Sequence, residues 1–308
     1  MKRSRGVALI IALLLVAIGT LIVTALIDQD QLSLARTRNQ LREQQAYAYA
    51  RGLEAWAIDL LRRDRNAEPG RDSRQDGWAQ GLPPMAVPGG LLSGRMRDEN
   101  GCFNLNSLVP NGGEDAIAIR RFERLLSVLK VDPGIGENLI DWIDADSTPH
   151  PRGAESLSYL LLDPPYRAAN QPLTQVAELR LVRGVDARVY ALLEPHVCAR
   201  PAGSAINVNT ASVPVLMALA DGMSESAARR IYNEGHANFA TLAAFAAEIQ
   251  QLGLSLDGGD SGLGVESTRF LAETLLELDG IPFHYFSLIE RDPASGQLRV
   301  LARSRGVY

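Results

Sequence analysis

The first 27 residues constrain this chain more than any other segment. A short basic leader is followed by residues 7–27, a run of 21 residues that carries no charge. As a helix this run is about 31 Å long, which is enough to cross a bilayer core of about 30 Å. It is longer than the apolar core of a secretory signal peptide, and no small-residue cleavage site follows it. We therefore expect residues 7–27 to stay in the mature chain as a membrane-spanning helix.

Charge on the two sides of this run predicts its orientation. Lys2, Arg3 and Arg5 precede the run, and Asp28 and Asp30 follow it directly. Cationic flanks remain in the cytoplasm during membrane insertion. We therefore expect the N-terminus in the cytoplasm and an exported body of about 280 residues, either periplasmic or extracellular.

The composition of the body is that of a folded protein. Apolar residues make up 46% of the chain and charged residues 22%, both close to globular averages, and the length permits two domains. The net charge of -5 argues against a polyanion as the main partner. The two cysteines, Cys102 and Cys198, are a pair that usually forms a disulfide in an exported chain. Two buried free thiols are the alternative.

The helical pattern continues after the membrane run, up to residue 64. Only Gly52 interrupts it, and one glycine costs about 1 kcal/mol in a helix. We therefore expect residues 7–64 to form one helix of about 87 Å, whose second half lays an apolar stripe on a sheet. The stripe contains Leu32, Ala35, Leu41, Ala46, Ala50, Leu53, Ala57, Leu60 and Leu61.

The position of Gly6 resembles a prepilin signal. Gly6 stands between the basic leader and the apolar run, on the cytoplasmic side. In prepilins a dedicated peptidase cuts after this glycine, and the apolar helix becomes the N-terminus of the mature protein. The resemblance implies cleavage between Gly6 and Val7, followed by N-methylation, whereas the alternative is a plain single-pass anchor. The long amphipathic continuation favours a pilin, because a simple anchor has no reason to prolong its helix.

Strands are expected on either side of a helical middle region. Residues 66–92 are rich in Pro, Gly and charge and are predicted to form a loop. Gly94–Asp98 and Cys102–Asn106 are predicted to form a hairpin, since Asn-Gly at its centre is a turn signal. Near the C-terminus, residues 283–303 show the alternating side-chain pattern of strands and are predicted to form a second hairpin with its turn at Pro293–Gly296.

The middle region contains a short internal repeat. Residues 102–109 (CFNLNSLV) resemble residues 205–212 (AINVNTAS), and both have an Asn-apolar-Asn core followed by a Ser or Thr that can cap a helix. The sequence after the second copy resembles a helix-hairpin-helix unit. Backbone amides at the turn of such units hold a phosphate in DNA-binding proteins, so an exported DNA receptor is the rival interpretation.

Electrostatics weaken the DNA interpretation. The candidate hairpin turns at 134–137 and 222–225 each carry an acid, Glu137 and Glu225, where a phosphate would approach. Lys130 is the only lysine after Lys2, and the body is net acidic, so the term that dominates affinity for nucleic acid is missing. Helical units used for packing fit these residues better.

The whole chain resembles the K-type minor pseudopilins of type II secretion systems, from the leader to about residue 305. The motifs that carry the resemblance are RGVALI at 5–10, GCFNLNSLV at 101–109, DWIDADSTP at 141–149 with GAES at 153–156, YRAANQPL at 166–173, VAELRLV at 176–182 and NVNTASVPVL at 207–216. The resemblance implies an α+β pilin fold, in which a long helix packs on an antiparallel sheet and a large all-α domain with helix-hairpin-helix or SAM-like units is inserted.

The implied domain order follows from this resemblance. The domains are a leader at 1–6, a transmembrane helix at 7–27, the pilin helix and first strands at 28–109, the inserted helical domain at 110–200, and a second helical unit with the C-terminal strands at 201–308. Cys102 and Cys198 would then lie at the two ends of the insert. A bond between them would hold these ends together where the insert leaves the sheet.

The resemblance also implies a function. Such a protein caps the tip of a short periplasmic filament, starts its assembly in a heterotrimer with two other minor pseudopilins, and supports export of folded proteins across the outer membrane. It resides in the bacterial inner membrane with a periplasmic body. Further implied partners are the prepilin peptidase, the inner-membrane assembly platform, the secreted cargo and the outer-membrane channel, and nucleic acid is not among them.

Ile11 departs from ordinary pilins in an informative way. Most pilins carry Glu at the fifth mature position, where it pairs with the terminal ammonium of a neighbour, and that position is Ile11 when the chain starts at Val7. A carboxylate without a partner is costly in lipid. Since a subunit with no neighbour above it has no partner ammonium, Ile11 suits the tip of a filament.

Two acidic clusters are candidate calcium sites. Asp141, Asp144 and Asp146 come at a predicted helix end, and Glu155 follows after a Pro/Gly loop. Carboxylates at such gaps supply the oxygen ligands that Ca²⁺ prefers, and Asp144, Asp146 and Glu155 are the predicted ligands. The loop with Asp257, Asp260 and Glu266 is a second candidate. Helix capping and solvated surface charge are the alternative for both.

Signals of catalysis are absent from the sequence. His150, His196, His236 and His284 are far apart and show no metal spacing. There is no Gly-x-Ser-x-Gly turn and no phosphate loop. We therefore expect a structural and interaction protein, not an enzyme, that requires no cofactor and has calcium as its one candidate ligand.

Overall fold

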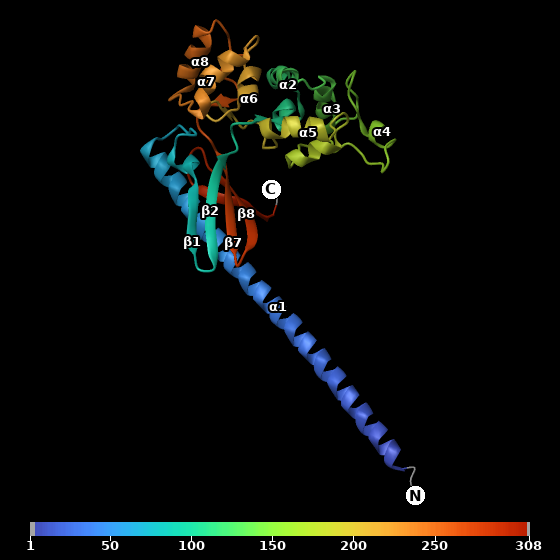
Figure 1. The fold of residues 1–308 in the computed structure, drawn as a ribbon. Coiled ribbons are helices and arrows are strands. Elements are labelled where there is room, and N and C mark those ends of the chain that lie inside the picture. The colour runs from blue at the N-terminus through green and yellow to red at the C-terminus, as the bar shows by residue number, and fades with distance from the viewer. Residues whose placement is uncertain (1–3, 307–308) are drawn as a thin grey trace.

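The computed structural model describes residues 4–306 and begins with one long helix. Helix α1 covers Ser4–Ala67, 64 residues, about 96 Å along its axis. Its first half projects away from the rest of the molecule (Figure 1) and is long and apolar enough to span a membrane by length and composition. Gly52 is exposed within α1, and a Cβ there would touch nothing, so no packing contact requires a glycine at this position. The single continuous helix predicted from the sequence is confirmed.

A five-stranded antiparallel sheet packs against the second half of α1. The spatial order of its strands is β1-β2-β7-β8-β9. The strands are β1 (Leu82–Val87), β2 (Gly90–Asp98), β7 (Arg269–Leu278), β8 (Ile281–Arg291) and β9 (Leu298–Arg305). Strands β2, β7 and β8 bury alternate residues, which gives the sheet one covered face.

From Ala46 onward, the predicted apolar stripe of α1 supplies the core between helix and sheet. Leu32, Ala35 and Leu41 were predicted to lie on the sheet and do not, because they are exposed before the sheet begins. Ala46, Ala50 and Leu53 pack against residues such as Leu276 and Phe283. Further along the helix, a second cluster is formed by Ala57, Leu61, Trp78, Met96, Phe270, Ala272 and Ile289. Small alanines at successive turns let the helix axis approach the sheet, and the larger residues fill the ends of the contact.

The remaining α-helices of the described chain come between β2 and β7 in sequence and lie over the end of the sheet that is farther from the N-terminus (Figure 1). The α-helices are α2 (Ala116–Val128), α3 (Gly134–Ile143), α4 (Ser156–Tyr159), α5 (Ala187–Leu193), α6 (Val213–Ala218), α7 (Glu225–Tyr232) and α8 (Leu242–Gln251). They share one hydrophobic core, which extends from Phe103 to Leu263. Both helical segments are therefore packed as one unit on top of the sheet. We call this unit, which extends from Phe103 to Leu263, the helical body.

Short elements accompany the helices: η1 precedes β1, and the others lie between β2 and β7. The 3₁₀ turns are η1 (Gly77–Gln80), η2 (Leu105–Leu108), η3 (Pro110–Gly112), η4 (Val176–Leu181), η5 (Glu194–His196) and η6 (Asn233–Gly235). The short strands are β3 (Phe103–Asn104), β4 (Val197–Cys198), β5 (Ile206–Asn207) and β6 (Leu263–Gly264). Strands β3 and β4 pair in parallel, and so do β5 and β6.

The predicted hairpin around Asn100-Gly101 is wrong. β2 pairs along its full length with β7, and the chain then leaves the sheet and enters β3, which pairs with β4. The side chain of Asn100 is buried and accepts hydrogen bonds from the backbone nitrogens of Thr268 and Arg269. A Cβ on Gly101 would lie 2.5 Å from the carbonyl oxygen of Thr210. Asn and Gly are therefore present for close packing across the exit from the sheet and not for a turn.

The C-terminal hairpin is confirmed, whereas the predicted loop at 66–92 is partly wrong. β8 and β9 are joined through a turn that contains Pro293–Gly296. Within 66–92 the chain forms η1, all of β1 and the start of β2. β1 contains Pro83 and Pro84, which are tolerated because β1 is an edge strand with no partner on its outer side.

Candidate functional site

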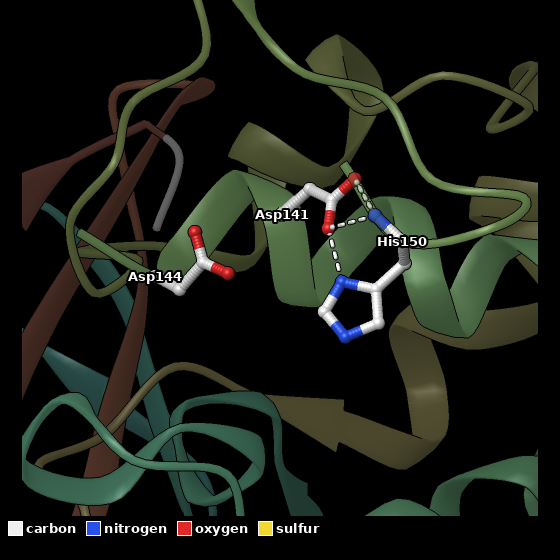
Figure 2. A group of neighbouring side chains, drawn as sticks. All are labelled: Asp141, Asp144 and His150. Atoms are coloured by element: carbon white, nitrogen blue, oxygen red, sulfur yellow. Dashed lines mark hydrogen bonds and ion pairs between the residues drawn. The ribbon is translucent and has the colours of Figure 1, made fainter. Parts of the chain in front are cut away.

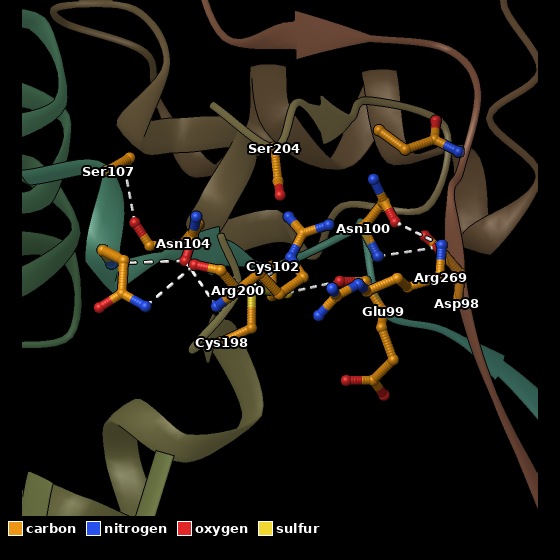
Figure 3. Close-up of a disulfide and its surroundings, with 12 residues drawn as sticks. Asp98, Glu99, Asn100, Cys102, Asn104, Ser107, Cys198, Arg200, Ser204 and Arg269 are labelled. Carbon is orange, nitrogen blue, oxygen red and sulfur yellow. Dashed lines mark hydrogen bonds between the residues drawn. A yellow bond between two sulfur atoms is a disulfide. The ribbon is translucent and has the colours of Figure 1, made fainter. Parts of the chain in front are cut away.

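A disulfide connects the two ends of the first helical segment. Cys102 follows the exit from β2, and Cys198 lies in β4, with 5.8 Å between their Cα atoms. The Asn104–Cys198 pair of the β3–β4 ladder is adjacent to this bond (Figure 3). The predicted Cys102–Cys198 bond is confirmed. We call this junction, residues 99–106 together with 197–201, the neck.

The two Asn-apolar-Asn motifs are buried, and their Asn side chains hydrogen-bond the backbone of distant segments. The Oδ1 atom of Asn104 accepts from the backbone nitrogen of Arg200 at 2.9 Å, and Asn106 Nδ2 donates to the carbonyl oxygens of Leu173 and Arg200. In the second copy, Asn209 bonds both backbone groups of Phe239. An amide side chain can donate and accept at once, which explains why Asn recurs where two chain segments must be tied together.

A second cluster lies at the loop after α3. One carboxylate oxygen from each of Asp144, Asp146 and Glu155 lies within 4.8 Å of the others. Asp144 ends α3, and Glu155 caps α4, so the helix ends deliver both side chains to the same place. Asp144 is 8% exposed and Glu155 5% exposed. The three residues predicted as calcium ligands are therefore close together.

Two of these carboxylates have oxygens that lack a partner. Asp144 Oδ1 and Glu155 Oε1 are buried without a hydrogen bond within residues 4–306. Burial, with Asp146, Glu155 and Asp141 nearby, raises the pKa of Asp144 to about 6. Burial also raises the pKa of Glu155. Unpaired oxygens and mutual repulsion are what a bound cation would relieve.

Asp141 has a different role from the other acids of this loop. Its carboxylate is fully buried, accepts from the backbone nitrogen of His150 at 3.2 Å, and contacts the ring Nδ1 of His150 (Figure 2). His150 Nε2 lies 3.2 Å from Glu114. Burial lowers the pKa of His150, but Asp141 and Glu114 raise it by more, so the net shift is upward. A Cβ on Gly153 would lie 1.9 Å from Asp141 Oδ2, so only glycine fits against this carboxylate.

Asn170 is a site residue that the sequence reasoning missed. Its Nδ2 donates to the backbone oxygen of Asp146, and its Oδ1 is buried with no partner in the described part of the chain. An amide oxygen is a further ligand type that Ca²⁺ accepts. In the sequence, the only trace of this role is the Asn of YRAANQPL. In the structure this Asn adopts a positive φ of 46°, which few residues other than Asn and Gly tolerate.

The second predicted calcium loop does not assemble. Asp257 is held by Arg120 at 2.9 and 3.0 Å and by Arg124 at 3.2 Å. Among the described residues, Asp257, Asp260 and Glu266 form no group with oxygens close enough for a shared ion. The carboxylate of Asp257 instead ties α2 to the loop after α8, which is the structural alternative to a metal site.

An acidic group that the sequence did not predict lies at the end of α1. Oxygens of Asp64, Asp72 and Asp76 lie within 4.8 Å of one another. Asp72 is fully buried and pairs with Arg291 of β8, which is 2% exposed. Burial raises the pKa of Asp64 to about 7 and that of Asp72 to about 6. Arg291 and Arg71 offset part of the negative charge. Since Asn207 Nδ2 also donates to the backbone oxygen of Asp72, this group joins the helix, the sheet and the helical body.

The remaining predicted positions lie in the N-terminal part of α1. Gly6 and Val7 are in its first turns, and Ile11 is one turn further, with 52% of its surface exposed. Ile11 therefore points into the surroundings of the helix, where a lipid or a neighbouring helix would touch it.

A cleft separates the neck from the sheet. It encloses about 410 Å³ and is lined by residues that include Trp78, Arg97, Glu99, Cys102, Glu194 and Ser212. His196 Nδ1 lies 2.9 Å from Ser212 Oγ near this cleft. Burial lowers the pKa of His196, which favours its neutral ring. Glu194 is the acid whose charge acts on the pKa of His196, but it forms no hydrogen bond with the ring within residues 4–306, so the Ser–His contact lacks the third group of a catalytic triad.

Comparison with known proteins gives one family. Two family models, both described as type II secretion system (T2SS), protein K, match residues 101–202 and 206–266. The chain is 36% identical to type II secretion system protein K of Pseudomonas aeruginosa, over 99% of this chain and 94% of that protein. It is 32% identical to the corresponding protein of Pectobacterium carotovorum subsp. carotovorum, over 100% and 98% of the two chains.

A solved structure is similar in fold. It is the crystal structure of the GspK-GspI-GspJ complex from the type 2 secretion system of enterotoxigenic Escherichia coli. The TM-score is 0.74 at 29% sequence identity, and the match covers 89% of this chain and 100% of the other. The similarity therefore includes the sheet and the helical body together.

Proposed function

This chain belongs to the protein K family of the type II secretion system, and we propose that it caps the tip of the pseudopilus. In this proposal it starts assembly of the filament together with other minor pseudopilins. The finished filament then supports export of folded proteins across the outer membrane. The protein acts as a structural component and not as an enzyme.

The position of the helical body carries this proposal. The body lies over the end of the sheet that is farther from the membrane-spanning part of α1 (Figure 1). Subunits of a pilin-like filament stack with their long helices side by side and their sheets outward. A body in this place occupies the volume into which the next subunit would rise, whereas the lower part of α1 is free to receive neighbours from below.

Ile11 supports the same position. A tip subunit has no neighbour above it whose terminal ammonium would need a carboxylate at the fifth mature position. Ile11 is apolar and exposed on α1, so it can face lipid or a helix without leaving a charge unpaired.

The partners follow from the structural neighbour. That protein was crystallised in a complex with GspI and GspJ. We infer that this chain forms an equivalent heterotrimer through α1. Exposed apolar side chains continue on α1 beyond the membrane run, at Leu32, Leu34, Leu41 and Tyr47, and would pack against partner helices.

Processing and location complete the proposal. A prepilin peptidase would cut between Gly6 and Val7, and Val7 would be N-methylated. The protein would cross the inner membrane once, with a cytoplasmic N-terminus and a periplasmic body, as its flanking charges indicate. The assembly platform of the inner membrane, the outer-membrane channel and the exported cargo are further proposed partners.

We also propose that Ca²⁺ binds at Asp144, Asp146 and Glu155. The unpaired, buried oxygens of Asp144 and Glu155 support this site, and Asn170 would add an amide oxygen. The ion would stabilise the loop between α3 and α4 and would take no part in a reaction. No other cofactor is needed for a structural role.

The helix pairs α2–α3 and α6–α7 are proposed to be helix-hairpin-helix units used for packing. Gly134 and Gly136, in the first turn of α3, are buried, and a Cβ on Gly136 would touch Phe122 and Leu126. Glu137 in the same turn is bound by the backbone and guanidinium of Arg152 at 2.7–2.9 Å. A phosphate would meet this carboxylate first, so nucleic acid is not a proposed partner.

Two measurements test the tip assignment. Immunogold labelling of pseudopili should place the unaltered protein at one filament end. The purified periplasmic part of the chain, with its sheet and its helical body, should bind other minor pseudopilins with a stoichiometry of about 1:1 and should not form homopolymers. Label along the whole shaft, or self-assembly into filaments, would show that the assignment is wrong.

A further inference from the structure

The two sulfurs of the neck disulfide have different surroundings. Cys198 is 4% exposed, and the Nε–H group of Arg200 points at its Sγ from 3.3 Å. Cys102 is less buried, lines the cleft of about 410 Å³, and has the carbonyl oxygen of Glu99 at 3.0 Å from its Sγ. Figure 3 shows the guanidinium of Arg200 beside the bond. One sulfur therefore faces a cation and the other faces a carbonyl oxygen and a cleft.

Arg200 keeps its charge in this position. It is 4% exposed, and its NH1 group has no partner within residues 4–306. Burial lowers the pKa of Arg200 to about 10, while Asp98 and Glu99 act in the opposite direction. The group is therefore a cation at neutral pH. The other charges that act on it are Asp98, Glu99 and Arg269. The printed side-chain contacts of its guanidinium, within residues 4–306, are Cys198 Sγ and the backbone oxygen of Ala205, so no carboxylate there forms an ion pair with it.

We propose that the neck disulfide is a directional site for thiol–disulfide exchange, in which an external thiolate attacks Cys102 and Cys198 leaves as a thiolate held by Arg200. The new bond forms between the external sulfur and Cys102 Sγ. The Cys102–Cys198 bond breaks, and its electron pair stays on Cys198 Sγ beside the Arg200 Nε–H. One disulfide replaces another, so no oxidant or reductant beyond the thiol is needed. The reverse step, attack of the Cys198 thiolate on a mixed disulfide at Cys102, closes the neck again.

The physical basis is the dependence of exchange on the leaving sulfur. A thiol next to a cation has a lowered pKa, and a sulfur with a lower pKa leaves faster. The Glu99 carbonyl has the opposite effect at Cys102, because it repels a thiolate and accepts a hydrogen bond from a neutral thiol. The cleft makes Cys102 the accessible sulfur. Charge and access therefore select the same direction.

The neck should stay folded while the bond is open. Asn104 and Asn106 bind the 197–201 segment and Leu173 through hydrogen bonds that do not depend on the disulfide. Exchange can therefore be followed on the native full-length chain. Opening the bond loosens the connection between the sheet and the helical body without releasing the body.

The direction can be read from the unaltered protein. The full-length chain in detergent is treated briefly with 2-mercaptoethanol at neutral pH, quenched with N-ethylmaleimide, and mapped by mass spectrometry. We expect the mercaptoethanol adduct on Cys102 and the maleimide on Cys198. Adducts on Cys198, or equal adducts on both cysteines, would overturn the proposal, and this result needs no variant.

Variants test the role of Arg200. Arg200→Gln should slow exchange by about threefold to tenfold, because the thiolate loses its cation, and Arg200→Lys should retain most of the rate. Arg97→Gln is the matched control, since Arg97 lines the same cleft but is exposed and bound to Glu99, and its rate should stay within about twofold. An Arg200→Gln rate equal to that of the unaltered protein would remove Arg200 from the mechanism.

A second measurement serves if Arg200→Gln does not fold. The pH dependence of maleimide alkylation is compared between Cys198 in the Cys102→Ser chain and Cys102 in the Cys198→Ser chain. Cys198 should react at half its maximal rate at a lower pH than Cys102. The opposite order, or identical profiles, would contradict the proposal.

Discussion

Arg303 on the edge strand β9 donates two hydrogen bonds to Glu54 in the middle of α1, at 2.7 Å through Nε and 3.0 Å through NH2. Glu54 is only 5% exposed, and it also accepts from Ser287 at 2.8 Å. Burial raises the pKa of Glu54, but the bonds from Arg303 and Ser287 lower it by more, so the net pKa is below its usual value. The last strand of the sheet is therefore attached to the helix through one buried carboxylate.

Removing Arg303 should destabilise the contact between helix and sheet. Arg303→Met leaves the Glu54 carboxylate buried with fewer partners and should lower the free energy of unfolding by about 1–2 kcal/mol, since the pair is partly solvated. Because the pKa of Glu54 is lowered on folding, this contribution is present above the ordinary carboxyl pKa and is lost as the pH falls. Urea unfolding of the full chain in detergent at neutral and acidic pH measures both effects.

Arg305→Gln is the control for this substitution. Arg305 also joins β9 to α1, through Glu43, but both side chains are about half exposed. Its loss should cost less than about 0.5 kcal/mol. Equal losses for the two variants would show that burial of Glu54 does not matter.

Asp64 should make the protein less stable as the pH rises. Its pKa is about 7 when folded, against 3.8 as the ordinary value, because burial and the nearby Asp76 and Asp72 oppose its charge. A raised carboxyl pKa gives stability that is complete below the unfolded pKa and is lost as the pH rises through about 7. Asp64→Asn should therefore stabilise the chain at pH 8 by about 1 kcal/mol, after allowance for screening by solvent, and should have little effect near pH 4.

Asp59, on the same helix and partly exposed, is the control for Asp64. It pairs with Arg63 at 2.6 Å on the surface, so Asp59→Asn should change stability by less than about 0.5 kcal/mol at either pH. Thermal unfolding at both pH values decides the matter. A loss of stability at pH 8 on Asp64→Asn would mean that the carboxylate has an unrecognised partner.

Calcium should stabilise the loop after α3. At a Ca²⁺ concentration 100 times the dissociation constant, binding to the native state alone adds about 2.7 kcal/mol, which appears as a higher melting temperature than in EGTA. Asp144→Asn should abolish this increment, and Asp260→Asn, in the loop that does not assemble, should keep it. An increment that survives Asp144→Asn would place any calcium elsewhere.

What the sequence predicted well rests on local patterns. The stripe of α1 and the alternation in β8 and β9 are periodic over many residues, so burial on one face fixed both elements. The Cys102–Cys198 bond followed from the exported body and the even cysteine count. These features do not depend on knowing which distant segments meet.

What the sequence missed depends on distant contacts. Asn100-Gly101 has the local chemistry of a turn, but its partners are Thr210, Thr268 and Arg269, more than 100 positions away. β1 was assigned to a loop because of Pro83 and Pro84, which only an edge strand tolerates.

The missed site residues have the same cause. Asn170 reaches Asp146, 24 positions earlier in the chain and on the other side of α4, and Asp72 meets Arg291 219 positions later. No spacing rule connects such pairs, because the fold of the intervening chain brings them together. Sequence reasoning therefore found the cluster of Asp144, Asp146 and Glu155, which are close in the chain, and not these residues.

Processing should occur at Gly6. Mass spectrometry of the mature protein from membranes should give a chain that starts at N-methylated Val7. Gly6→Val should block cleavage and leave the intact leader, because the peptidase requires a residue without a side chain there, whereas Gly19→Ala, further along the same helix, should be processed normally. An unaltered protein that keeps Met1, or starts beyond residue 20, would contradict the pilin interpretation.

The helical body should be what keeps this subunit out of the filament shaft. Asp98 pairs with Phe270 across β2 and β7, and the Glu99 nitrogen bonds the Arg269 oxygen, so the two ends of the helical region lie next to each other. Residues 101–267 can therefore be replaced by a short Gly-Ser linker that preserves all five strands of the sheet. Combined with Ile11→Glu, which restores the carboxylate for a neighbouring ammonium, this excision should let the subunit occupy positions along the shaft in immunogold images. Ile11→Glu alone should stay at the tip or fail to assemble, since the body still fills the space above. Exclusion of a well-folded excised double variant from the shaft would mean that something other than the body and Ile11 determines the position of this protein in the filament.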